Sequence, residues 1–262
     1  MRRILFLIAV LAGIVPDQAH TQATAVVASR NFLGVTGEAG LVSFREDLLV
    51  PLSFSGPGFA LGGSFAHRSD GSLLDLDLSM RISYGINRFD HEAISLSTRI
   101  RSAWLWNIRS GGRLGELWIG AVLPFRINDM YIFSWDDAHM YWITSYGMGP
   151  AIQWRSHYSS ETTIAVGMDL PVVHLVSRPP SYRFDKQDGM NRFFFWLGHP
   201  QRSFQLEPIG SYTAITLHGT MEWRSAESFS SLGLQIRFSR MDGDKPEQDL
   251  NTLIVYSYRW GL

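Results

Sequence analysis

The sequence has no cysteine and little charge. This excludes disulfides, thiolate zinc sites, cysteine catalysis and lipoprotein anchoring through an N-terminal cysteine. Only 18% of the 262 residues are charged, against about 25% in an average protein. The 23 basic and 24 acidic side chains leave a net charge of -1. Nucleic acid is therefore not an expected partner, because its binding requires a concentrated basic surface.

Recognised catalytic and metal-binding motifs are missing as well. Walker-type, Rossmann-type, His-Glu-x-x-His and Gly-x-Ser-x-Gly patterns do not occur. The eight histidines include no pair at i, i+2 or i, i+4, the spacings that metal ligands often use. The sequence therefore predicts no metal site and no cofactor.

Long hydrophobic runs are missing except at the N-terminus. Arg2 and Arg3 precede an apolar run from Ile4 to Val15, and Ala23-Thr24-Ala25 follows as an A-x-A cleavage site. This order predicts a signal peptide over residues 1–25 that is removed on export. The run is too short to cross a bilayer, which requires about 20 apolar residues.

What the chain does have is an apolar period of two. Within residues 72–87, the even positions from Leu74 to Ile86 are apolar, and the residues between them are polar except Gly85, with Asp75, Asp77 and Arg81 among the polar set. A strand directs alternate side chains to opposite faces, so this segment has one apolar and one polar face. The same pattern predicts strands over residues 47–55, 59–66, 72–87, 94–101, 117–121, 140–154, 162–170, 213–223, 231–239 and 252–262.

These segments predict an all-β fold, an up-and-down antiparallel transmembrane β-barrel of ten strands. Several are about 10 residues or longer, the length of a tilted membrane strand, whereas strands of soluble sheets are mostly about 5–6 residues long. The barrel domain would cover residues 47–262, after an N-terminal segment, 26–46, at the periplasmic mouth or in the lumen. Twelve strands would result if 31–43 and 192–198 also paired, but the tight turns would then lie outside, so ten is favoured.

The connections form two sets. Tight turns are expected at 68–71, 109–113, 156–160 and 225–227, and longer connections at 128–139, 177–210 and 241–249. Outer-membrane barrels have short periplasmic turns and longer outside loops. The stretch 177–210 is expected to be an outside loop, with a short hairpin around 193–196.

Five tryptophans are expected on one rim. They lie just before tight turns or next to the C-terminus, and indole prefers the membrane interface. This predicts an aromatic girdle of Trp104, Trp106, Trp154, Trp223 and Trp260.

The last strand resembles the C-terminal signal of Gram-negative outer-membrane β-barrels as a class. Tyr256, Tyr258, Trp260 and Leu262 alternate up to the last position, where that signal usually ends in Phe. The resemblance implies insertion by the barrel-assembly machinery and a monomer surrounded by outer-membrane lipid. It assigns no specific family.

The polar faces supply the first candidate site. Small polar residues mixed with both charge signs suit the narrow interior of a barrel, where opposite charges can pair. The expected lumen network comprises Asp75, Asp77, Arg81, Arg99, Arg101, Glu222 and Arg237.

His157 and Ser159 form a second candidate. The His-x-Ser spacing resembles that of outer-membrane phospholipase A and lipid A 3-O-deacylase, which implies a histidine that activates a serine for acyl transfer. The sequence departs from those families at Ser160-Glu161, where an Asn would be expected. The pair also lies in a predicted tight periplasmic turn.

Three functions therefore stay open. The favoured one is a small outer-membrane barrel with a structural or adhesive role, or with limited small-solute passage. The second is a barrel-embedded lipid acyl hydrolase that uses His157 and Ser159. The third is a soluble secreted β-sandwich or barrel whose apolar face lines a cavity for a small apolar ligand.

Overall fold

The computed structural model describes residues 30–46, 52–69, 71–109, 115–132, 139–178, 204–225, 227–242 and 246–262. Over these residues no helix is long and apolar enough to span a membrane. The signal peptide expected over 1–25 lies outside the described residues.

The strands are β1 (Arg30–Glu46), β2 (Leu52–Arg68), β3 (Ser72–Ile86), β4 (Glu92–Arg109), β5 (Glu116–Ile132), β6 (His139–His157), β7 (Thr162–Asp169), β8 (Val173–Ser177), β9 (Gln205–Pro208), β10 (Tyr212–Arg224), β11 (Ser228–Met241) and β12 (Glu247–Gly261).

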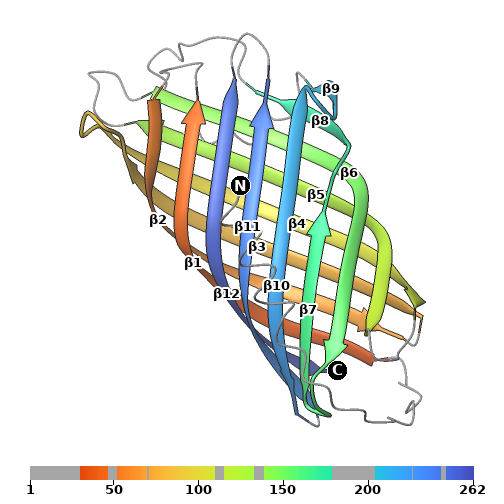
Figure 1. Cartoon of the computed structure of the whole chain (residues 1–262). Helices are drawn as coiled ribbons and strands as arrows, with labels where there is room; N and C mark the ends of the chain where they lie inside the picture. Colours follow the sequence, from red (N-terminus) through yellow and green to blue (C-terminus); the bar gives the residue numbers. More distant parts are fainter. Residues whose placement is uncertain are drawn as a thin grey trace.

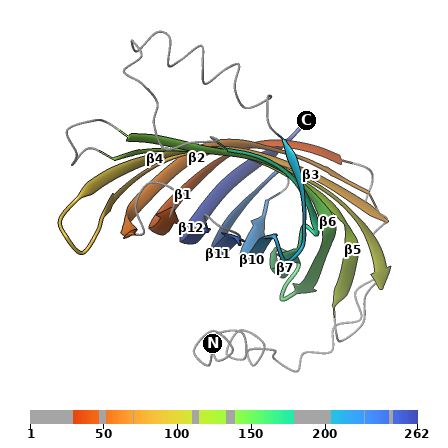
Figure 2. The ribbon, with the colours of Figure 1, turned by 90° about the horizontal axis from the view of Figure 1, so that it is seen from above.

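Ten of these strands close into an antiparallel barrel. They pair in the order β1 to β7, then β10, β11 and β12, and β12 pairs back with β1 through a register that places Gly37 opposite Tyr256. Figure 2 shows these tilted strands curving around one interior. The short strands β8 and β9 extend the sheet at one end, where β8 pairs with the first part of β6 (Figure 1). The predicted ten-stranded all-β barrel is confirmed.

The first two strands differ from the prediction. Residues 31–44, expected as a segment at the mouth or in the lumen, lie in β1 and pair with both β2 and β12. The ranges 52–55 and 59–66, expected in separate strands, belong to the single strand β2; residues 47–51 lie outside the described part. Gly56, Pro57 and Gly58 fill the gap between the two predicted strands. Instead the ladder to β3 skips Gly56 and Pro57 and resumes in the same register, because proline has no N–H to donate.

The connections lie at two ends, named here the turn end and the loop end. The turn end holds the hairpins β2–β3, β4–β5, β6–β7 and β10–β11, together with the start of β1 and the end of β12. The loop end holds the remaining connections and β8 and β9. β9 falls within the predicted loop 177–210, which is therefore not entirely loop; residues 179–203, with the expected hairpin around 193–196, lie outside the described residues.

The wall is apolar outside and polar inside. On β3, the Met80 side chain is 64% exposed, whereas its neighbour Arg81 is 5% exposed. The same alternation exposes Leu61 on β2, Leu232 on β11 and Ile254 on β12. A soluble barrel with an internal apolar ligand would have the opposite arrangement.

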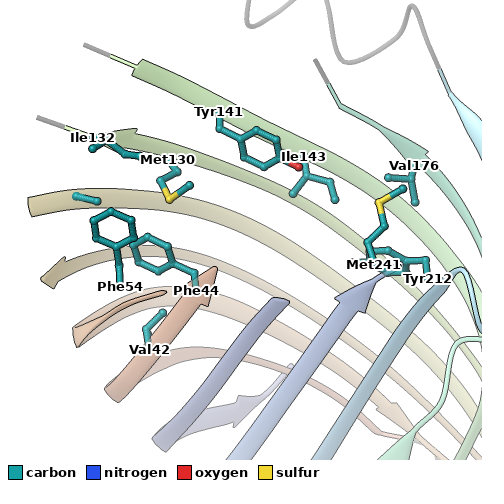
Figure 3. Packing of buried hydrophobic residues seen from close by; sticks show 11 residues of the cluster. Val42, Phe44, Phe54, Met130, Ile132, Tyr141, Ile143, Val176, Tyr212 and Met241 are labelled. Carbon is teal, nitrogen blue, oxygen red and sulfur yellow. The ribbon is translucent and has the colours of Figure 1, made fainter. Parts of the chain in front are cut away.

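Apolar side chains form clusters in the interior near its two ends. At the loop end, a cluster of buried side chains from seven barrel strands and β8 includes Phe44 and Phe54, whose rings stack with centroids 5.5 Å apart (Figure 3). At the turn end, Phe32, Ala66 and Phe229 form one cluster, and a second contains Leu73, Ala103, Leu105, Trp118, Val122 and Ala151. The polar interior lies between these loop-end and turn-end apolar layers.

Candidate functional site in the barrel interior

A cluster of carboxylates and arginines fills the turn-end half of the interior. Asp75 and Asp77 are alternate residues of β3, so both point inward. The Arg101 guanidinium donates to both oxygens of Asp169, at 2.7 and 2.9 Å, and lies 3.7 and 3.6 Å from Asp75 and Asp77. Arg259 donates to the same two aspartates at 2.9 and 3.1 Å. Asp75 and Asp77 thus bridge Arg101 on β4 and Arg259 on β12, and Asp169 pairs with Arg101 alone.

Glu222 anchors a second group beside this cluster. Its carboxylate accepts a hydrogen bond from Arg155 at 2.5 Å and weaker ones from Arg68 at 3.4 Å. The guanidinium of Arg68 also lies 4.7 Å from the ring centroid of Phe229, and that of Arg259 lies 5.5 Å from it. These cation–π contacts join the ion pairs to the turn-end apolar layer.

The middle of the interior has fewer carboxylates. Arg237 donates to Glu38 at 2.6 Å and to Gln235 at 2.5 Å. Arg81 donates to the amide oxygen of Asn251 at 2.7 Å. Arg99, on the inward face of β4 between Ser97 and Arg101, has no hydrogen bond and no ion pair within 4.0 Å to any residue that the structure describes.

Another polar group lies toward the loop end. Arg126 pairs with Asp249 and donates to Ser239 at 2.9 Å. Asn251 donates to Asp249 at 2.9 Å, and the Tyr141 hydroxyl donates to Glu247 at 2.8 Å. Tyr141 belongs to the loop-end apolar layer, so this layer is also tied to the charged interior.

Two cavities lie among these groups. The larger, of about 120 Å³, is lined mainly by the turn-end clusters, and the smaller, of about 70 Å³, lies nearer the loop end. Arg99 and Arg237 line both cavities and therefore lie between them. Since one water requires about 10–15 Å³ on this measure, each cavity has room for several waters or a small ion.

In comparisons with known proteins, the similar solved structures are outer-membrane β-barrels. The outer-membrane protease OmpT from Escherichia coli has a TM-score of 0.53 and 5% identity, covering 93% of this chain and 99% of OmpT. The translocator domain of the autotransporter NalP from Neisseria meningitidis has a TM-score of 0.41 and 10% identity, covering 98% and 94%. The transport unit of the autotransporter AIDA-I from Escherichia coli has a TM-score of 0.40 and 9% identity, and the alignment covers 96% of this chain and 97% of that transport unit.

These similarities concern the fold alone. No family model and no curated protein sequence matches the chain.

The structure places all seven charges of the expected lumen network in the interior. Asp75, Asp77 and Arg101 join one cluster, Glu222 the second, and Arg81, Arg99 and Arg237 the middle. Sequence reasoning missed most of their partners, namely Glu38, Arg68, Arg155, Asp169 and Arg259. The alternation on β12 contains the signal for Arg259, which lies on the polar face with Asn251 and Ser257.

The five tryptophans of the expected girdle all lie near the turn end. Trp104 and Trp106 stack on the outside of β4 with ring centroids 5.2 Å apart. Trp223 and Trp260 are also exposed, and Trp154 is half-buried. Trp118 at the same end points inward and belongs to an apolar cluster instead.

His157 and Ser159 stabilise a turn rather than face one another along a strand. β6 ends at His157, whose ring lies 3.0 Å from the Thr163 hydroxyl and 3.4 Å from Glu116. The Ser159 hydroxyl accepts hydrogen bonds from the backbone amides of Glu161 and Thr162, at 3.2 and 3.0 Å. The arrangement on one strand face that the hydrolase hypothesis required is therefore not present, because residues 158–161 have left the strand.

Proposed function

We propose that this protein is an outer-membrane β-barrel with a closed interior, which acts as a structural anchor for the segments at its loop end. The observation that carries the proposal is the division of its surfaces. The outer face is apolar, and the interior is filled by cross-linked charges.

The outer face fits lipid and not water. Large apolar side chains are exposed on it along most of the strands. Soluble monomers rarely expose continuous apolar patches larger than a few hundred Å². A closed barrel leaves no unpaired strand edge, which the hydrocarbon core of a membrane requires. This arrangement disfavours the soluble alternative, in which the apolar side chains would line an internal cavity.

The interior fits a closed barrel better than an open pore. Side chains fill much of a barrel of this size. Here the arginine–carboxylate clusters link strands across the interior, and an apolar layer lies at each end. Such cross-links hold the opposite walls together and suit a structural role.

The tryptophan girdle and the C-terminal residues support a location in the outer membrane. The turn-end tryptophans would lie at the headgroup level of the membrane. Tyr256, Tyr258, Trp260 and Leu262 all face outward, where the barrel-assembly machinery could contact them.

The C-terminal signal can be tested separately. Trp260→Ala combined with deletion of Leu262 should reduce the fraction recovered in the outer membrane, while refolding of the purified chain into detergent stays unchanged. Equal membrane recovery would show that assembly does not depend on this signal.

Fractionation, gel mobility and conductance test the main proposal. The protein should be recovered in the outer membrane, and the unboiled sample should migrate differently from the boiled one. In planar bilayers it should show no steady conductance, with an open porin as the positive control. Recovery in a soluble fraction would overturn the membrane location.

Limited small-solute passage is the second candidate. The two cavities that meet at Arg99 and Arg237 favour it, because each has room for several waters and together they extend along the interior. Steady conductance of the purified barrel would favour this role over the closed anchor.

A further inference from the structure

The middle of the interior has more positive charge than its partners neutralise. Eight arginines and five carboxylate side chains line the two cavities, and Asp249 pairs with one of these arginines. Two arginines thus have no carboxylate within 4.0 Å among the described residues, and they are Arg81 and Arg99. A buried charge without a partner costs several kcal/mol, so this site favours a bound counter-ion.

Buried hydrogen-bond donors without partners also indicate a counter-ion site in the middle of the interior. The Nε atoms of Arg81 and Arg237 are buried and have no hydrogen-bond partner within the described structure. Arg81 as a whole is almost fully buried. Arg81, Arg99 and Arg237 all line the smaller cavity, so the three arginines surround one region.

We propose that Arg81, Arg99 and Arg237 bind a small tetrahedral oxyanion, of the phosphate or sulfate class, between the two cavities. A dianion would neutralise the two unpaired charges. Its oxygens would accept hydrogen bonds from Arg99 and from the free Nε donors, in the charge-assisted geometry that guanidinium groups form with such anions. This site goes beyond the structural role, since a barrel can anchor loops without it.

Direct binding tests the site. The full chain is folded in detergent micelles at a series of ³²P-labelled inorganic phosphate concentrations, so that the apolar layers need not open, and the phosphate retained by the folded barrel is measured after gel filtration. One phosphate per barrel is expected. Arg99→Gln should weaken binding at least about tenfold, the effect of losing a hydrogen bond to a charged group.

Arg240→Gln is the matched control, because Arg240 pairs with Asp242 on the exposed surface. It should bind phosphate like the wild type. Unboiled gel mobility checks that each variant is folded. Binding no higher than in empty micelles, or equal binding by Arg99→Gln, would overturn the proposal.

Thermal unfolding gives a second readout. Without phosphate, Arg99→Gln should melt at or above the wild-type temperature, because it removes an unpaired charge. With phosphate, at ionic strength matched by chloride, the wild type should gain stability and Arg99→Gln should not. An equal gain in both would reflect only the general stabilising effect of phosphate. Because these assays use micelles, their outcome is independent of conductance and membrane location.

Discussion

Arg101 connects more carboxylates than any other interior residue that the structure describes. It contacts Asp169, Asp75 and Asp77, and only Arg259 shares two of these partners. Replacing Arg101 by methionine keeps an unbranched apolar stem but leaves buried carboxylates without their cation. We expect the free energy of unfolding to fall by about 3–5 kcal/mol. Urea titration in lipid vesicles, followed by tryptophan fluorescence, measures it.

Arg240→Met provides the comparison. Arg240 and Asp242 form an exposed ion pair at the loop end, so this change should cost less than about 1 kcal/mol. Equal stability of the Arg101 and Arg240 variants would show that the interior cluster does not hold the barrel together.

At the scale of single residues, the sequence predicts which side chains face the interior but not which of them pair. The alternation on β3 and β4 was enough to predict that Asp75, Asp77 and Arg101 face one side together. It could not predict their partner Asp169, which is 68 residues from Arg101, or the Glu38–Arg237 pair, which is 199 residues apart. Those contacts depend on which strands meet across the closed barrel, and a local pattern does not contain this information.

At the scale of the element, strand boundaries were harder to predict than strand faces. β1 contains three glycines, Gly34, Gly37 and Gly40, which weaken the apolar alternation, and its range was a strand only in the twelve-strand alternative. β2 contains Pro57, which lies in the gap between the two predicted strands. In the sheet, pairing on the other side of each strand compensates for these local weaknesses. The correct count of ten therefore rested on one missed strand and one strand divided in two.

Close pairing of β4 and β5 depends on Gly120. A Cβ atom at this position would collide with the backbone carbonyl of Trp104, and no flexible side chain could move away. We expect Gly120→Ala to lower the free energy of unfolding by about 1–3 kcal/mol, the range found for overpacking. Urea unfolding in vesicles measures this effect.

Gly219→Ala on β10 is the matched control, since nothing lies within 4 Å of the added atom. Its stability should stay unchanged or rise by up to about 1 kcal/mol, because alanine restricts the unfolded chain. A loss of stability in Gly219→Ala equal to that in Gly120→Ala would mean that glycine is needed for strand flexibility and not for close approach.

For the whole molecule, the decisive question is whether the apolar outer face meets lipid. Arginine substitutions along the outward positions of β3 answer it. Met80 lies near the middle of the strand, and Leu74 lies beside Trp104 in the girdle. In lipid vesicles, Met80→Arg should cost about 2–4 kcal/mol and Leu74→Arg about 0–1 kcal/mol, because the penalty falls from the bilayer midplane to its interface. If both variants instead lost little stability and lost it equally, the face would be solvated by water, and the membrane proposal would fail.

The depth dependence matters more than either value alone, since arginine at Met80 could also be destabilising because of a packed protein contact there. Repeating the pair on β12, with Ile254→Arg against Tyr258→Arg, removes that ambiguity, because only a membrane gives the same profile on separate strands of the wall.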